Sequence, residues 1–253
     1  MCKIVLSILL IFIFIPVLSF GFSEKGQDCS KCHKLTTTEA TTLLKDLITN
    51  VKVTNIRISP VKAMWELAIE ANSKKGIIYV DFSKKHFISG SIVSIKEKKN
   101  LTQERFEDLN RVDVSQVPLA DAIVVGNKNA KHKVIVFTDP DCSFCKKLHA
   151  EIKKVVQDRK DIAFYKKMFP LKIHPEAYEK SKTIVCEKSL EMLENAFEKK
   201  PLPKPKCETT AVDENIKLAE KLGISGTPAL IMPDGRLISG YREAKALKEL
   251  IGK

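Results

Sequence analysis

The stretch that decides the fold is residues 134–149, Val-Ile-Val-Phe-Thr-Asp-Pro-Asp-Cys-Ser-Phe-Cys-Lys-Lys-Leu-His. Its first four residues are apolar and largely β-branched, which is typical of a buried central strand, and the Asp-Pro-Asp after them indicates a turn. Apolar residues then recur at helical spacing, so a helix should begin at Cys142. Free backbone N–H groups and the positive end of the helix dipole stabilise a thiolate there. We therefore expect the pKa of Cys142 to lie below that of a free thiol, about 8.5.

Cys142 and Cys145 form a CxxC pair, a spacing that redox sites and zinc sites share. Zinc is disfavoured because the other cysteines supply no matching second pair of ligands. A strand that runs directly into CxxC and a helix resembles the thioredoxin arrangement, in which Cys145 would lie one turn into the helix, shielded from solvent. Thr227 and Pro228 support this interpretation, because thioredoxin-like proteins place a cis proline opposite the CxxC and X–Pro is the common site of cis bonds. An ordinary turn proline is the alternative.

The first residues of the chain are typical of a secretory signal peptide. Lys3 is followed by an apolar run over residues 4–18 and then by small residues, so cleavage is expected after Gly21. An uncleaved anchor is disfavoured because the run is shorter than the roughly 20 residues that cross a bilayer. Export would place the cysteines in the periplasm, an oxidising compartment where disulfides persist. The formal net charge of +12 comes with scattered lysines, which favours a solvated surface and no nucleic acid as a partner.

Cys29, Cys32 and His33 form a CxxCH motif in the segment of residues 22–36. CxxCH is the attachment signature of c-type haem, in which the cysteines form thioethers and the histidine binds iron. A haem also needs an enclosing apolar pocket, and only a short polar segment precedes this motif. Two interpretations stay open: a covalent c-type haem, and, in preference, a local disulfide or auxiliary dithiol.

The next part of the chain reads as a small α+β domain followed by a connector. A helix is expected over residues 38–48, and short β-like runs follow over residues 51–58, 64–69, 77–82 and 87–95. This domain spans residues 37–100, and the linker spans residues 101–116. The linker helix, over residues 101–112, is highly charged and suits an exposed position between domains.

Residues 117–253 then form the catalytic domain, in which a helical segment interrupts the strands. Cys186 and Cys207 lie at the two ends of that segment. In an exported protein this spacing favours a structural disulfide, which closes a loop of about 20 residues and contributes roughly 3 kcal/mol to stability. A second redox pair is the alternative, although neither cysteine has the helix-start position of Cys142.

Residues 137–149, residues 222–229 and the Gly240-Tyr241 pair together resemble the DsbC/DsbG family of periplasmic thiol:disulfide isomerases. The resemblance implies an α+β fold: a thioredoxin-like catalytic domain with a helical insertion, joined by a linker helix to a small cystatin-like dimerisation domain. It further implies a V-shaped homodimer that a DsbD-type membrane partner keeps reduced. Ser-Phe between the two active cysteines departs from the Gly-Tyr typical of DsbC, and the CxxCH extension has no counterpart in the best-known members.

The function expected from these residues is isomerisation or reduction of wrong disulfides in misfolded exported proteins. Cys142 would attack the client disulfide, Cys145 would resolve the mixed disulfide, and Thr227 and Pro228 would present backbone to the client. No metal or required cofactor is expected. The alternatives are a dithiol oxidase of the same fold, a redox chaperone that grips clients in the dimer cleft, and a haem electron carrier.

Overall fold

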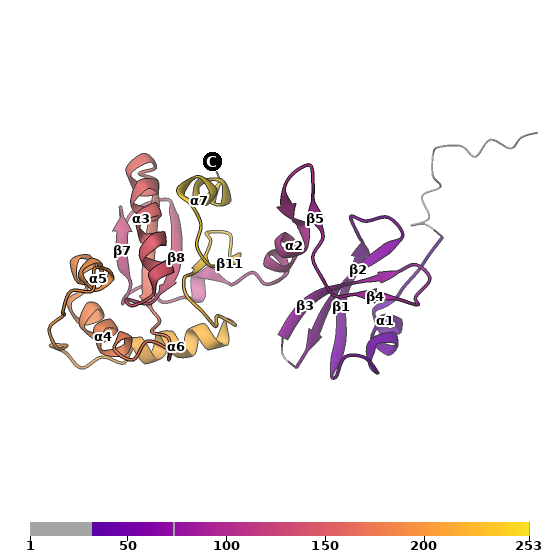
Figure 1. The fold of residues 1–253 in the computed structure, drawn as a ribbon, viewed down its shortest axis with the longest axis horizontal. Helices are drawn as coiled ribbons and strands as arrows, with labels where there is room; N and C mark the ends of the chain where they lie inside the picture. Colours follow the sequence, from indigo (N-terminus) through magenta and orange to yellow (C-terminus); the bar gives the residue numbers. More distant parts are fainter. Residues whose placement is uncertain (1–31, 73, 253) are drawn as a thin grey trace, which may run out of the picture.

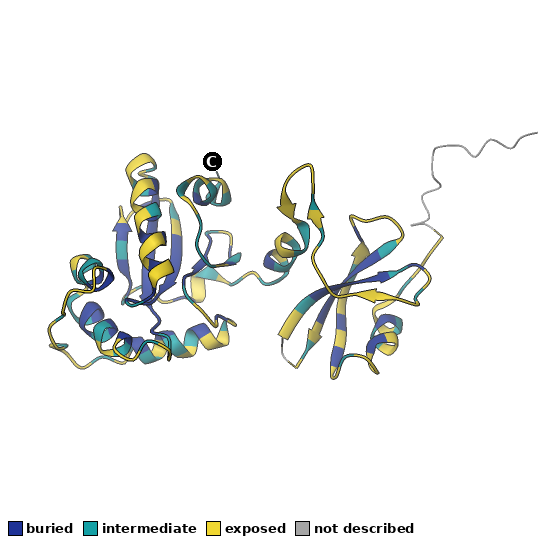
Figure 2. Ribbon diagram, in the orientation of Figure 1, coloured by how far each residue is buried: buried dark blue, intermediate teal, exposed yellow. Residues whose placement is uncertain are grey.

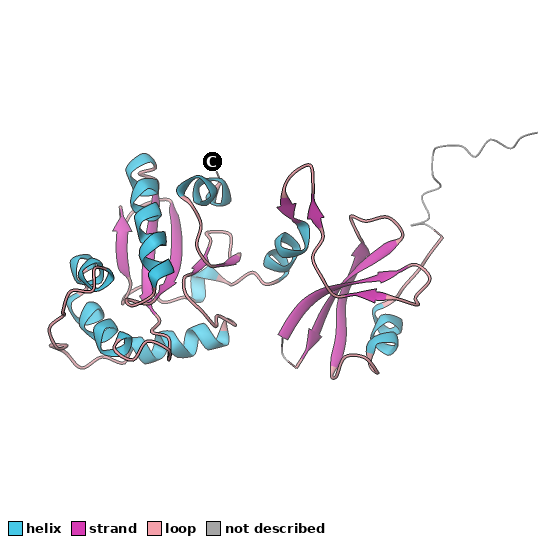
Figure 3. Cartoon of the chain, in the orientation of Figure 1, coloured by secondary structure: helices cyan, strands magenta, loops and turns pink. Residues whose placement is uncertain are grey.

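A computed structural model of the protein describes residues 32–72 and 74–252, which fold into two units with a helix between them (Figure 1). The predicted signal peptide, residues 1–21, and Cys29 lie outside the described residues. Among the helices of the described residues, none is long and apolar enough to span a membrane. The two units are built differently: an antiparallel sheet with helices on either face, and a mixed sheet enclosed by helices (Figure 3).

The N-terminal unit is an antiparallel sheet of order β1-β2-β3-β4. Its elements are α1 (Thr37–Leu44), β1 (Val51–Ile58), β2 (Met64–Ala71), β3 (Lys74–Asp81) and β4 (Phe87–Ile88). The side chain of Thr36 caps α1 by accepting from the Glu39 N–H at 3.2 Å. One face of the sheet packs on α1 through a core that includes Leu44, Trp65 and Leu67. The helix ends earlier than expected, and the strand expected over residues 87–95 is divided into β4 and β5 (Val93–Ser94).

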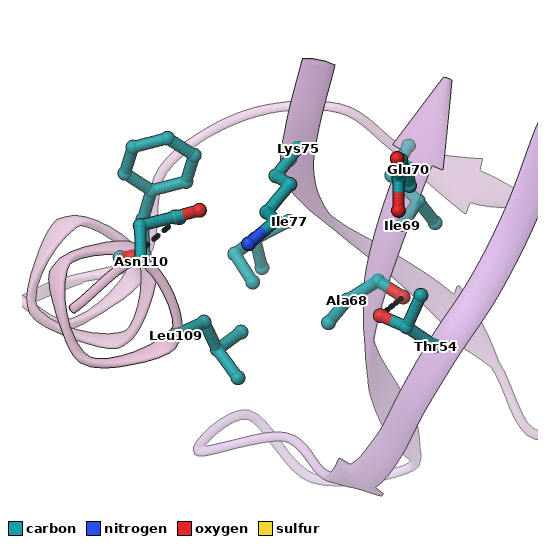
Figure 4. Close-up of a pocket in the computed structure, with 10 residues that line it drawn as sticks. Thr54, Ala68, Ile69, Glu70, Lys75, Ile77, Leu109 and Asn110 are labelled. Carbon is teal, nitrogen blue, oxygen red and sulfur yellow. Dashed lines mark hydrogen bonds between the residues drawn. The ribbon is translucent and has the colours of Figure 1, made fainter. Parts of the chain in front are cut away.

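The opposite face of this sheet is covered by the linker helix α2 (Leu101–Leu109), which follows β6 (Lys99–Asn100). Phe106 and Leu109 of α2 pack against Ala68, Ile77 and Tyr79 of the sheet. The expectation of an exposed connector was therefore wrong, because the two apolar side chains of this charged helix find a partner in the sheet. A cavity of about 270 Å³ remains beside this contact, with Leu109, Asn110 and Lys75 on its walls (Figure 4).

The chain between the two units is anchored to the C-terminal hairpin. The Val112 N–H donates to the carbonyl oxygen of Gly235 at 2.7 Å, and the Arg111 side chain donates to the carbonyl oxygen of Asp234 at 3.1 Å. Gly235 has a φ of +86°, and a Cβ there would collide with the Val112 carbonyl oxygen. Glycine is therefore required on both counts at this position. A short 3₁₀ turn, Val114–Gln116, then leads into the C-terminal unit.

The C-terminal unit is built on a sheet of order β11-β10-β8-β9-β7, in which β8 and β9 are parallel and the other pairs are antiparallel. The strands are β7 (Ile123–Gly126), β8 (His132–Thr138), β9 (Ile162–Met168), β10 (Ala229–Ile231) and β11 (Leu237–Ser239). Helices α3 (Ser143–Asp158) and α7 (Ala244–Ile251) cover one face, and α6 (Ala211–Lys221) covers the other. The central strands are almost entirely buried (Figure 2), as the apolar run of residues 134–137 predicts.

The helical insertion between β9 and β10 contains α4 (Ala177–Glu187) and α5 (Leu190–Phe197) in addition to α6. Cys186 near the end of α4 is joined by a disulfide to Cys207, in the loop before α6. The Thr183 hydroxyl of α4 donates to the carbonyl oxygen of Pro203 in the same loop at 2.9 Å. Covalent and hydrogen bonds thus hold the loop against α4, so that α5 stays packed near the start of α3.

Candidate active site

Cys142 is the N-cap residue of α3, directly after the turn that follows β8. The turn is organised by the buried carboxylate of Asp139, which accepts from the N–H groups of Asp141 and Leu171, each at 2.7 Å. The same carboxylate lies 2.8 Å from Nδ1 of His174. Because these bonds fix the loop after β9 to the turn after β8, the sulfur of Cys142 is presented at a defined place at the end of the central strands.

The environment of Cys142 stabilises its thiolate and lowers its pKa to about 5. The chief cause is a hydrogen bond from the Cys145 thiol; burial opposes it, and the Thr227 side chain and the N–H groups of Cys145 and Phe144 add to the lowering. The helix start therefore contributes as expected, but the neighbouring thiol contributes more. A hydrogen bond to the charged form of an acid always favours that form.

Cys145 lies one turn further into α3 and is almost fully buried. Burial raises the pKa of its thiol far above the ordinary value, and the hydrogen bond that it gives to Cys142 raises it further. In the structure both cysteines are free thiols. The Cys142 sulfur is thus an anion at neutral pH, while the Cys145 sulfur keeps its proton. These are the protonation states required of a nucleophile and of a resolving thiol that attacks later.

Thr227 and Pro228 lie beside Cys142, as part of the segment that precedes β10. The peptide bond between them is cis, and the Cys142 sulfur is 3.5 Å from the Thr227 carbonyl oxygen. The Pro228 carbonyl oxygen accepts from the Gly240 N–H at 2.8 Å. Ladder pairing of β10 with β8 begins only at Ala229, so the Thr-Pro segment extends past the sheet at the same end as the cysteines.

Three buried polar residues beneath the cysteines were missed from the sequence: Thr138, His149 and Lys166. His149 Nε2 lies 2.9 Å from a carboxylate oxygen of Glu194 on α5, and burial lowers the pKa of His149 to about 4. The sequence does contain a signal for Lys166. Two consecutive lysines lie in the middle of the apolar strand β9, and because successive side chains point to opposite faces of a sheet, one of them must point into a packed layer.

The CxxCH motif is described only in part. His33 is stacked on the ring of Phe82 with 4.9 Å between ring centroids, Cys32 is exposed, and Cys29 lies outside the described residues. Over residues 32–72 and 74–252, no group of three His, Cys, Asp or Glu side chains has the geometry to hold a metal ion.

Comparisons with known proteins match both units of the chain. The family described as "Disulfide bond isomerase protein N-terminal domain" matches residues 33–103, and the family "Thioredoxin-like domain" matches residues 119–253. The thiol:disulfide interchange protein DsbC of Salmonella typhimurium is 30% identical over 207 residues, which are 79% of this chain and 81% of that protein. The chain belongs to the DsbC family of thiol:disulfide interchange proteins.

Other DsbC relatives match over different shares of their length. DsbC of Escherichia coli K12 is 28% identical over 206 residues, covering 79% of this chain and 82% of that protein. The probable DsbC of Bordetella avium is 27% identical over 175 residues, so this chain spans 61% of its length, less than two thirds. Among solved structures, a disulfide interchange protein from Neisseria gonorrhoeae is 35% identical with a TM-score of 0.46, and the match covers 53% of this chain and 96% of that one.

Membership of the DsbC family confirms the fold class expected from the sequence and the interpretation of the CxxC as a thiol:disulfide interchange site. It gives no support to a haem, because the N-terminal match begins at His33 and leaves out Cys29 and Cys32.

Thiolate formation at Cys142 predicts a distinct pH profile of alkylation. The rate of reaction of reduced protein with iodoacetamide at Cys142, followed by peptide mapping, should rise with pH through about 5 and stay nearly flat from pH 6 to 8. Cys145 should react far more slowly over the whole range, because its thiol is buried and protonated. A Cys142 profile with its midpoint near the free-thiol value, about 8.5, would contradict the assignment.

Proposed function

We propose that this DsbC-family chain isomerises or reduces non-native disulfides in exported proteins, with Cys142 as nucleophile and Cys145 as resolving thiol. The observation that carries the proposal is the opposite ionisation of two sulfurs one helical turn apart, the first pKa lowered and the second raised. Cys142 is only 7% exposed, so a client disulfide has to be held close against it. A thiolate that is backed by a protonated thiol can then both open and close that disulfide.

The reaction proceeds by two exchanges of sulfur partners. The Cys142 thiolate attacks one sulfur of a client disulfide, forms a bond to it and releases the other client sulfur as a thiolate. Isomerisation follows when a client thiolate attacks the client sulfur of the mixed disulfide, which forms a new disulfide within the client and releases Cys142 as a thiolate. Net reduction follows when Cys145 attacks Cys142 instead, so that two electrons pass to the client and the Cys142–Cys145 disulfide forms.

The Thr227-Pro228 segment would hold the client beside the sulfur. Its main chain lies past the point where β10 pairs with β8, and an extended client segment can add to such backbone as a further strand. Phe144, between the two cysteines, is 55% exposed, and Ile173 in the neighbouring loop is 77% exposed. These apolar side chains suit unfolded clients, which expose apolar residues of their own.

The cellular setting follows from the family and from the predicted signal peptide. The proposed compartment is the periplasm, the proposed reductant is a DsbD-type membrane protein, and the proposed assembly is a homodimer formed by the N-terminal unit. Support for the dimer comes from the exposed edge strand β4 and the hairpin after it, where Ile88 is 52% and Ile95 is 93% exposed. Unpaired edges with apolar side chains require cover, and a second copy can supply it.

Substitution of the two cysteines should separate the steps. Cys142→Ala should abolish the refolding of scrambled ribonuclease, because no thiolate remains to open its disulfides. Cys145→Ala should accumulate mixed disulfides between Cys142 and the client, visible on non-reducing gels after acid quenching. Full activity of the Cys142→Ala protein in this assay would overturn the proposed function.

A charge placed on the edge strand should separate the dimer. Ile88→Lys puts an ammonium where an apolar contact is proposed, so light scattering should report a monomer at concentrations at which the wild type is a dimer. Ile173→Lys serves as the matched control, since it changes an isoleucine on the other unit that is even more exposed, 77% against 52% for Ile88, and it should remain dimeric. A dimeric Ile88→Lys protein would exclude β4 from the interface.

A further inference from the structure

Lys166 and Lys167 are adjacent in β9 and both are buried, but they differ in their hydrogen bonding. Lys167 is buried, and its ammonium donates to the Asp121 carboxylate and to the Pro118 carbonyl oxygen. Lys166 points to the other face, is completely buried, and has no hydrogen-bond partner for Nζ among the described residues. Burying a charged or polar group without a hydrogen-bond partner costs free energy. A lysine at position 166 is therefore unfavourable for stability, which suggests that its amine has a chemical function.

Lys166 lies on the face of the sheet that α3 and α5 cover. Its neighbours at alternate positions are Phe164, which packs with Leu148 of α3, and Met168, which packs with Cys145. Its Nζ is 5.4 Å from the centroid of the Phe197 ring on α5, and this ring packs in the same cluster as Cys145. The side chain therefore lies in the same buried layer as the resolving cysteine, close enough for the charges of the two groups to interact.

Among the described residues, none of the titratable groups around Lys166 forms an ion pair with its amine, so the amine is free to gain or lose a proton. On α3 these are Cys145, His149 and Lys153, and on α5 the group is Glu194. Glu194 is already engaged, at 2.9 Å from His149 Nε2 and 3.0 Å from Lys153 Nζ. Burial lowers the pKa of Lys166 to about 8, so a substantial fraction of this amine is neutral just above neutral pH.

We propose that Lys166 accepts the proton that the Cys145 thiol loses when it resolves a mixed disulfide. The inference rests on the proposed function and adds to it a group that sets the balance between isomerisation and net reduction. A faster loss of the Cys145 proton shortens the life of the mixed disulfide, so that fewer clients have time to rearrange. No other side chain in this buried layer is both unpartnered and basic at neutral pH, within the described residues.

The proposed step balances in atoms and electrons. The proton passes from the Cys145 sulfur to the neutral Lys166 amine, the Cys145 sulfur bonds to the Cys142 sulfur, and the bond between Cys142 and the client sulfur breaks. The bonding pair leaves with the client sulfur, which becomes a thiolate and takes a proton from solvent. The ammonium of Lys166 returns its proton when the Cys142–Cys145 disulfide is next reduced.

The test measures formation and closure of the mixed disulfide separately. Reduced full-length protein is mixed with excess synthetic peptide disulfide, and samples are acid-quenched over time. Intact-mass spectrometry separates protein that carries the peptide from protein with a closed disulfide, and peptide mapping assigns the cysteines. Lys166→Met is the main variant, and Lys133→Met is the control, because Lys133 lies on the same sheet, is exposed, and also sits near an aromatic ring, 5.7 Å from the Tyr165 centroid.

In the wild type, closure should speed up with pH and level off above about 8, as the Lys166 amine becomes neutral. Lys166→Met should slow closure about 10²-fold at pH 8, the lower end of the effect of a proton-transfer group, and the levelling should disappear. Formation of the mixed disulfide should be unchanged within about twofold, since Lys166 is not among the groups that set the pKa of Cys142. Lys133→Met should match the wild type in both steps.

A second variant, Lys166→Arg, keeps the charge but cannot release a proton, so it should close as slowly as Lys166→Met. Wild-type closure rates and pH profiles in Lys166→Met, or rescue by Lys166→Arg, would overturn the proposal. Either result would leave the proposed function standing, because Cys142 would still form the mixed disulfide. Absence of any Cys142 mixed disulfide in the wild type would instead overturn the proposed function itself.

Discussion

The pairing of the two thiols of the CxxC, one with a lowered and one with a raised pKa, is the interaction on which the rest of the site depends. It fixes one negative charge on Cys142 by holding the proton on Cys145, and it requires both sulfurs to lie on the first turn of α3. The turn after β8 makes this possible, because the buried Asp139 carboxylate ties it to the loop after β9. The central strands, and the cores on both faces of the sheet, can be understood as the support that keeps this one contact in place.

The same contact determines how folding and redox state are coupled. The pKa of Cys142 is lowered from an ordinary 9.0 to about 5, so ionisation stabilises the folded, reduced protein. That contribution is complete above pH 9 and is lost as the pH falls toward 5. Forming the Cys142–Cys145 disulfide gives up the stabilised thiolate, so the reduced form is favoured. The Cys186–Cys207 disulfide, at a helix end in the insertion, involves no such loss and serves a different purpose: it holds a loop.

Residues with strong local signals were predictable from the sequence, and residues whose role depends on tertiary packing were not. The apolar run before CxxC, the helix after it and the hairpin of β10 and β11 all follow from periodicity and turn residues. The position of α2 did not follow, because Phe106 and Leu109 make too narrow an apolar face to reveal that a sheet covers it. Lys166 and His149 were missed for a related reason: a charged residue within an apolar strand or helix gives no indication of which distant elements enclose it. The chief cause of the low pKa of Cys142 was also missed, since the orientation of one thiol toward another is fixed by side-chain packing.

The most direct test of the account is the equilibrium of the purified protein with glutathione redox buffers at pH 7, with both cysteine pairs followed by thiol trapping and mass spectrometry. The stabilised Cys142 thiolate predicts a reduction potential for Cys142–Cys145 above about −200 mV, well above that of thioredoxin at about −270 mV. Cys186–Cys207 should stay oxidised throughout that range. A Cys142–Cys145 potential at or below that of thioredoxin would contradict the claim that this sulfur is held as an anion.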